Sequence, residues 1–106
     1  MTGFDDRGKA FEDKYKHDQE LQFRVTNRRN KLLGLWAAAQ LGKAGADAEA
    51  YAKDVVMSDF QAPGDDDVIE KIMADFKAAG VDQSEHRIRR HMDELQLTAK
   101  EQVMKE

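Results

Sequence analysis

The chain has 106 residues, the size of one domain, with 21 acidic and 17 basic side chains and a net charge of −4. The absence of cysteine excludes a disulfide scaffold and a thiolate metal site. No apolar run approaches the ~20 residues that span a bilayer, and the first residues lack the apolar core of a signal peptide. We therefore expect a cytoplasmic protein without direct membrane insertion. One proline and seven glycines among many helix formers predict an all-α fold.

Residues 1–19 contain few large apolar side chains, so this segment has little to bury. We predict that it is a flexible N-terminal arm, disordered or a nascent helix when free. If the arm becomes helical, Phe4, Phe11 and Tyr15 lie on one side of it, at spacings of seven and four residues. Such an aromatic stripe is typical of a segment that binds a partner. The alternative is a solubilising tail whose aromatic side chains fold back on the rest of the protein.

Residues 20–106 show four amphipathic segments, which predict a four-helix bundle with short loops and antiparallel neighbours. Glycine suits the left-handed backbone past a helix end, so Gly42 and Gly80 are expected to end the first and third helices. The Ala62-Pro63-Gly64 sequence breaks the second, and the acidic run at 65–67 favours the start of the third. Asp82 and Ser84 compete as the cap of the fourth. The helices are expected at about 20–41, 47–60, 65–79 and 83–104.

Apolar residues at helical spacing predict which side chains face the core. In chain order these are Leu21, Val25, Leu32, Leu35, Trp36 and Ala39; Tyr51, Ala52, Val55, Val56 and Phe60; Val68, Ile69, Ile72, Met73, Phe76 and Ala79; and Ile88, Met92, Leu95, Ala99 and Val103.

The histidines do not form a metal-binding pattern. His86 and His91 are five residues apart, which places them on different faces of one helix. The acidic run at 65–67 lacks the alternating ligands of a calcium loop. Because no nucleophile and base stand at a recognisable spacing either, we predict no metal site, no catalytic residue and no enzymatic activity.

Two basic clusters could grip phosphate oxygens through guanidinium groups. No glycine-rich phosphate loop accompanies them, and the negative net charge opposes binding to nucleic acid. Solvated helix faces paired with acidic neighbours such as Asp93 and Glu94 are one interpretation, and contacts to a nucleotide or another phosphate are the other. The residues concerned are Arg28, Arg29, Lys31, Arg87, Arg89 and Arg90.

The sequence resembles the zeta subunit family of bacterial ATP synthases, a family of ATPase inhibitor subunits. Its most specific motifs are the opening FDDR at 4–7 with AFE at 10–12, and the block RRNKLLGLWAA at 28–38. Further matches occur at residues 50–52, 59–60, 63–65, 88–89, 92 and 94–95, so the resemblance spans nearly the whole chain.

The resemblance implies a four-helix bundle preceded by an inhibitory arm. In this family the arm inserts as a helix between alpha and beta subunits of the catalytic head, beside the gamma subunit, and blocks rotation during ATP hydrolysis. We expect the free protein to be a monomer. Through its binding to the synthase, we expect it to be peripheral to the inner membrane. No cofactor is required, and an adenine-nucleotide-binding or sensing module without inhibitory activity is the alternative. The expected partner-binding residues are Phe4, Asp5, Asp6, Arg7, Phe11, Glu12 and Tyr15.

Overall fold

The computed structural model describes the backbone of residues 2–59 and 64–106, and the side chains of residues 17–59 and 64–106. This part of the chain forms four helices: α1 (Thr2–Gln40), α2 (Gly45–Ser58), α3 (Asp66–Ala79) and α4 (Glu85–Met104). It contains no strand. The predicted all-α, four-helix architecture is confirmed. Phe60 and Pro63, expected at the end of the second helix and in the break after it, lie outside the described residues.

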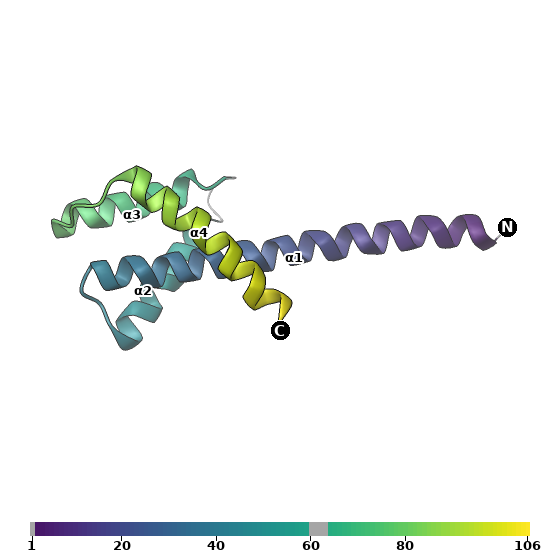
Figure 1. Cartoon of the computed structure of the whole chain (residues 1–106), viewed down its shortest axis with the longest axis horizontal. Coiled ribbons are helices and arrows are strands. Elements are labelled where there is room, and N and C mark those ends of the chain that lie inside the picture. The colour runs from purple at the N-terminus through teal and green to yellow at the C-terminus, as the bar shows by residue number, and fades with distance from the viewer. Residues whose placement is uncertain (1, 60–63) are drawn as a thin grey trace.

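Helix α1 has 39 residues and is therefore about 58 Å long. It accounts for the elongated outline of 66 × 25 × 21 Å and extends well beyond the other helices on the N-terminal side (Figure 1). The expected helix start near residue 20 is not a boundary, because one helix runs from the predicted arm into the bundle. Lengthening an existing helix needs no new nucleation, so a polar segment rich in helix formers can continue it. The functional division at residue 19 stays a prediction.

The predicted ends of the first and third helices and the predicted start of the fourth are present. Gly42 follows α1 with a φ of +77°, and Gly80 ends α3 with a φ of +73°, both in the left-handed region that favours glycine. Of the two candidate caps for α4, Ser84 takes the position, and its hydroxyl accepts a hydrogen bond of 3.1 Å from the backbone N–H of Arg87.

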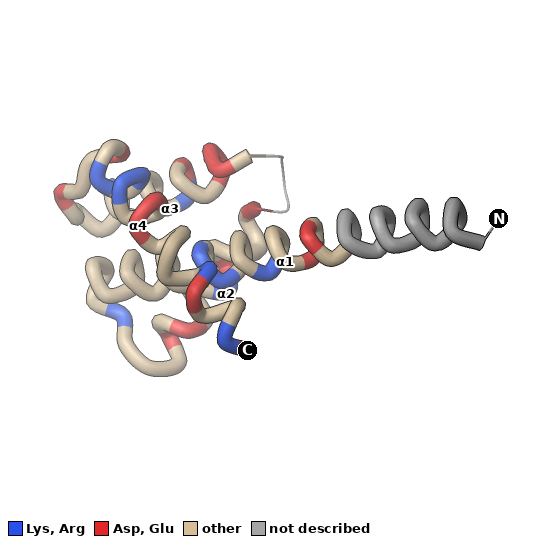
Figure 2. Tube along the Cα trace, turned by 45° about the vertical axis from the view of Figure 1, so that its right-hand side comes forward, with Lys and Arg blue, Asp and Glu red and all other residues tan. Residues whose placement is uncertain are grey.

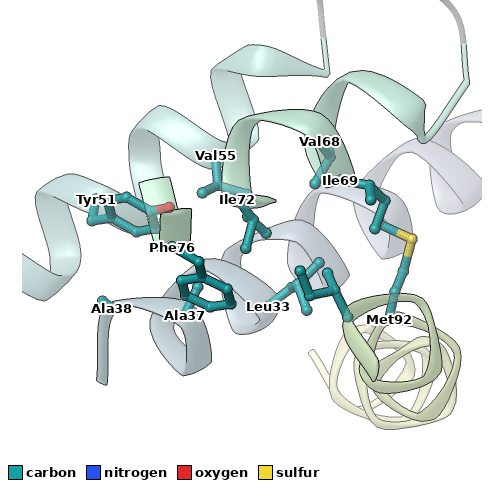
Figure 3. Packing of buried hydrophobic residues seen from close by; sticks show 11 residues of the cluster. Leu33, Ala37, Ala38, Tyr51, Val55, Val68, Ile69, Ile72, Phe76 and Met92 are labelled. Carbon is teal, nitrogen blue, oxygen red and sulfur yellow. The ribbon is translucent and has the colours of Figure 1, made fainter. Parts of the chain in front are cut away.

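The core lies where α1, α2 and α3 meet and is closed by α4 (Figure 3). A second, smaller cluster joins Val25 of α1 to Ala99 and Val103 of α4. Most of the predicted core residues are buried or packed against the core, but Ala39 and Ala79 are exposed. In α1 the buried face includes Arg29, Asn30, Leu33, Ala37 and Ala38. It is thus rotated from the predicted stripe, because polar side chains from two other segments, together with Asn30 of α1, satisfy Arg29 inside the protein.

Gly34 allows the close crossing of α1 and α2. A Cβ atom at this position would lie 2.7 Å from the Cα atom of Ala52 and 3.2 Å from the Cβ atom of Val55. The first of these neighbours is backbone, which cannot rotate away. The glycine within the RRNKLLGLWAA block therefore has a packing function: it lets two helices approach more closely than any side chain would permit.

Candidate functional site

The predicted arm occupies the first part of α1. By helical register, positions 4, 11 and 15 share one face of this helix. The arm's predicted contact residues have side chains outside the described part of the chain, so their contacts stay predictions: Phe4, Asp5, Asp6, Arg7, Phe11, Glu12 and Tyr15.

A groove between α1 and α4 begins where the arm joins the bundle. Its volume is about 680 Å³, and Leu21 and Val25 contribute apolar surface to it. Asp18, Gln22 and Arg29 line it from α1 and, by register, lie on the same face of the helix as positions 4, 11 and 15. The arm's predicted binding face therefore leads directly into this groove.

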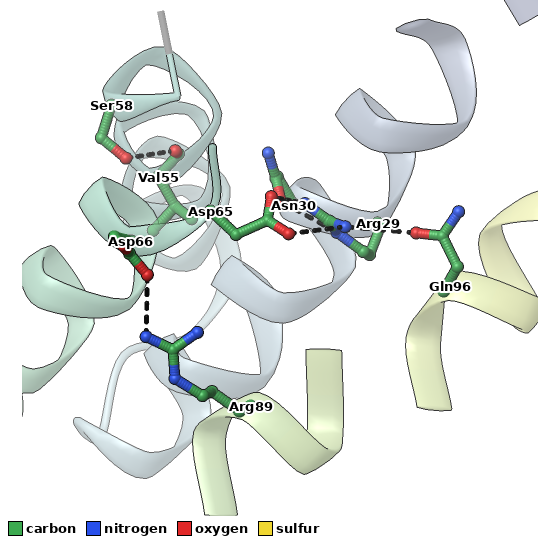
Figure 4. A network of polar contacts seen from close by, with 8 residues as sticks. All are labelled: Arg29, Asn30, Val55, Ser58, Asp65, Asp66, Arg89 and Gln96. Atoms are coloured by element: carbon green, nitrogen blue, oxygen red, sulfur yellow. Dashed lines mark hydrogen bonds and ion pairs between the residues drawn. The ribbon is translucent and has the colours of Figure 1, made fainter. Parts of the chain in front are cut away.

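Arg29 lies at the inner end of the groove and is only 7% exposed. Its guanidinium donates a 2.6 Å bond to Asp65, just before α3, and a 3.2 Å bond to Gln96 of α4. It also donates to the Oδ1 atom of buried Asn30 at 3.0 and 3.2 Å. Figure 4 shows this network, which joins α1, the start of α3 and α4 through one side chain. We call Arg29, Asn30, Asp65 and Gln96 the Arg29 network. A buried guanidinium with these partners holds a defined position.

Asp59 follows α2 and carries a perturbed carboxyl group. Burial raises its pKa above the usual 3.8, and the nearby Asp65 carboxylate raises it further, while Arg29 acts in the opposite direction. The folded protein therefore binds a proton at Asp59 more readily than the unfolded chain does. As the pH rises through the folded-state pKa, that stabilisation is lost.

We expect Asp59→Asn to make the protein more stable near pH 7 and to flatten the decrease in stability that begins above about pH 3.8. The amide keeps the shape of the side chain and removes the charge that the site disfavours. Thermal unfolding between pH 4 and pH 7 measures both effects, with Asp54→Asn on the exposed surface of α2, five residues earlier, as the matched control. A variant that is less stable than the natural protein at pH 7 would contradict this assignment.

The six basic residues of the predicted phosphate contacts do not converge on one described cavity. Arg28 lies with Lys31 beside the end of α4, whereas Arg29 points to Asp65 and Gln96. The cluster on α4 is engaged by acidic and amide side chains. Arg89 pairs with Asp66 at 2.9 Å and Glu85 at 3.0 Å, Arg90 pairs with Glu94 at 3.4 Å, and Arg87 donates to Gln83 at 3.4 Å. The three arginines of this cluster thus contact neighbouring carboxylates and amides.

No group of three or more potential metal ligands occurs among the residues that the structure describes. His91 stacks on Trp36 with ring centroids 4.2 Å apart, and its Nδ1 atom lies 3.8 Å from Glu94. None of the described helices combines the length and the hydropathy needed to cross a bilayer.

The sequence model of the family named ATPase inhibitor subunit zeta matches residues 1–102. The chain belongs to this family. A solved structure described as the solution NMR structure of a protein is similar to this zeta-family chain, with 41% identity and a TM-score of 0.72. That similarity covers 80% of this chain and 96% of the other. Comparison with curated proteins found no match.

From the sequence, Arg29 of this zeta-family chain was expected on a solvated helix face or in contact with a phosphate, and its burial was not predicted. The helical register does indicate that Arg29 is buried. It lies four residues after Val25 and four before Leu33, and both of these neighbours on the same face are apolar. The partners Asp65 and Gln96 come from segments 36 and 67 residues away. No periodicity within α1 could have indicated them.

Proposed function

We propose that this zeta-family chain inhibits ATP hydrolysis by the bacterial ATP synthase through its N-terminal arm, residues 1–19. The arm inserts at an interface between alpha and beta subunits of the catalytic head and stops rotation beside the gamma subunit. The protein thus acts by occupying a space and performs no chemistry of its own. Its place of action is the synthase, on the cytoplasmic side of the inner membrane.

The observation that supports this mechanism is the length of α1. The helix reaches from the bundle core to Thr2, far beyond α2, α3 and α4 (Figure 1). A helix anchored at one end by Leu33, Ala37 and Ala38 can transmit resistance along its axis when its other end is held in a cleft. The bundle, about 25 × 21 Å in cross-section, is wider than a single helix of about 10–12 Å and so would stay at the surface.

The three aromatic side chains alone supply a modest surplus of binding energy, so tight binding also needs an intact partner groove and charge complementarity. Burial of three aromatic side chains contributes about 5–8 kcal/mol, from which about 2–5 kcal/mol is subtracted when a disordered segment must fold on binding. Continuity of the arm with a packed helix reduces that ordering cost, because the helix already has a nucleus. The acidic and basic residues of FDDR would set the register through charge pairing at the rim.

Deletion of residues 1–18 is expected to abolish inhibition of the isolated catalytic head while leaving the bundle folded. A finer test replaces Phe4, Phe11 and Tyr15 together by alanine, which should weaken inhibition at least about tenfold, because a loss of 1.4 kcal/mol already has that effect. The matched control replaces Lys9, Asp13 and Lys16 by alanine, three positions on the other side of the same helix. ATP hydrolysis is the readout, with circular dichroism as a check on folding. Full inhibition by the truncated protein would overturn the mechanism.

The adenine-nucleotide-binding alternative stays a prediction. Four of its six expected contact residues, Arg28, Arg29, Arg89 and Arg90, are ion-paired with carboxylates. A phosphate would therefore have to displace these partners, which lowers the affinity expected at either cluster.

A further inference from the structure

A small basic pocket lies between α1 and the end of α4. Arg24, Asn27, Arg28 and Lys31 line it from α1, and Val103 and Glu106 line it from the other side. Its volume is about 280 Å³. Figure 2 shows basic positions of α1 beside the C-terminal end of α4. We call this site the basic pocket.

The side chain of Glu106 occupies the basic pocket. Its Oε2 atom accepts a 2.7 Å bond from Arg24, and its Oε1 atom accepts a bond from the guanidinium of Arg28. Arg28 is held in turn by a 3.0 Å bond to Gln102. The hydrogen bond from Arg28, and to a smaller extent that from Arg24, holds the pKa of the Glu106 carboxyl below its usual range. Glu106 lies beyond residues 1–102, the part that the family model matches.

The charge in the basic pocket is unbalanced. Three basic side chains and one acidic side chain line the pocket, so its side chains carry a net positive charge when Glu106 is bound. The ion pairs are also exposed: the Glu106 side chain is 40% accessible and that of Arg24 is 53% accessible. Exposed pairs are weak and are screened by salt, so an incoming group with several carboxylates can displace a single one.

We infer that the basic pocket binds carboxylates of an acidic segment on a partner protein, and that Glu106 competes with that segment. The position of Glu106 shows that one carboxylate can bridge the two guanidiniums, with one oxygen on each. A nucleotide fits less well, because the residues lining the pocket include no aromatic ring on which a base could stack. Arg24 is five residues beyond the predicted arm, so the acidic segment would belong to the protein that holds the arm. That last assignment rests on the proposed function.

The binding site is tested with the full-length protein and hexaglutamate, by following the arginine Nε–H resonances in an NMR titration. The resonances of Arg24 and Arg28 should shift, and Glu106→Gln should bind the peptide up to about fivefold tighter than the natural protein, the range expected for removal of an exposed ion pair. Glu101→Gln is the matched control, because it removes the same charge from an exposed position of α4. Equal affinities for the two variants would exclude competition by Glu106. Shifts produced by ATP but not by hexaglutamate would overturn the inference in favour of a phosphate site.

The partner is tested separately by inhibition of the catalytic head. Glu106→Gln should inhibit hydrolysis at lower concentration than Glu101→Gln, and the advantage should decrease at high salt. If hexaglutamate binds but the two variants inhibit equally, the acidic segment is not on the ATPase and the assignment of the partner is wrong. If the variant without the arm still inhibits, the proposed function is wrong. The peptide titration still shows whether the basic pocket binds carboxylates.

Discussion

Replacement of Asp65 by alanine is expected to lower the free energy of unfolding by about 2 kcal/mol, between the values for an exposed and a buried ion pair, because the Asp65 side chain is 44% accessible. The physical reason is the burial of Arg29, whose side chain is only 9% accessible and whose strongest contact is the 2.6 Å bond to Asp65. Without the carboxylate, the guanidinium keeps its charge in a site with little water. Chemical denaturation monitored by Trp36 fluorescence measures the loss.

The control for this prediction is Asp67→Ala, two residues further along the same acidic run, where a favourable interaction with the start of α3 and a repulsion of Asp59 are removed but no ion pair among the described residues is broken. A double variant that combines Arg29→Met with Asp65→Ala should recover much of the stability, because it removes both charges and keeps an unbranched side chain in the space. If Asp65→Ala costs no more than Asp67→Ala, the Arg29 network does not stabilise the bundle.

Gly34→Ala is expected to destabilise the protein by about 2 kcal/mol, a typical cost of overpacking. Helix propensity alone predicts the opposite sign, because alanine is favoured over glycine by about 1 kcal/mol inside a helix. We expect packing to prevail, since the added Cβ atom would meet the backbone of Ala52 at 2.7 Å and force α1 and α2 apart. At about 4–8 °C per kcal/mol for a domain of this size, the melting temperature should decrease by roughly 10 °C.

The matched control is Gly8→Ala, which makes the same chemical change on the same helix within the arm. There the propensity gain should appear as increased helicity by circular dichroism, without a lower melting temperature. A Gly34→Ala variant that is as stable as the natural protein would show that the two helices can separate at little cost, and the close crossing would then have no structural importance.

Several particular features were predictable from sequence because their causes are local. Gly42 and Gly80 end helices since the left-handed backbone suits them, and Ser84 caps α4 through a hydrogen bond three residues away. The apolar spacing of α3 predicted Val68, Ile69, Ile72 and Phe76 as buried, because one helix face carries nearly all of its large apolar side chains.

The Arg29 network was not predictable in this way. Arginine is a residue type that usually lies at the surface. The burial of Arg29 is favourable because Asp65 and Gln96, from distant segments, accept hydrogen bonds from its guanidinium. The same holds for Gly34, whose importance depends on Ala52 of α2, and for Glu106, which reaches Arg24 and Arg28 across 82 and 78 residues of chain.

Length and composition at the outset indicated one helical domain with a modest core and many charges. Spacing within a few residues was enough to predict four amphipathic helices, the glycines that end α1 and α3, and the aromatic positions of the arm. The three-dimensional structure adds that the arm and the first core helix form one continuous α1, and it shows which charges are buried or paired. The burial and pairing of charges depend on contacts between helices, and the free energy of such a contact belongs to both partners and not to either segment alone.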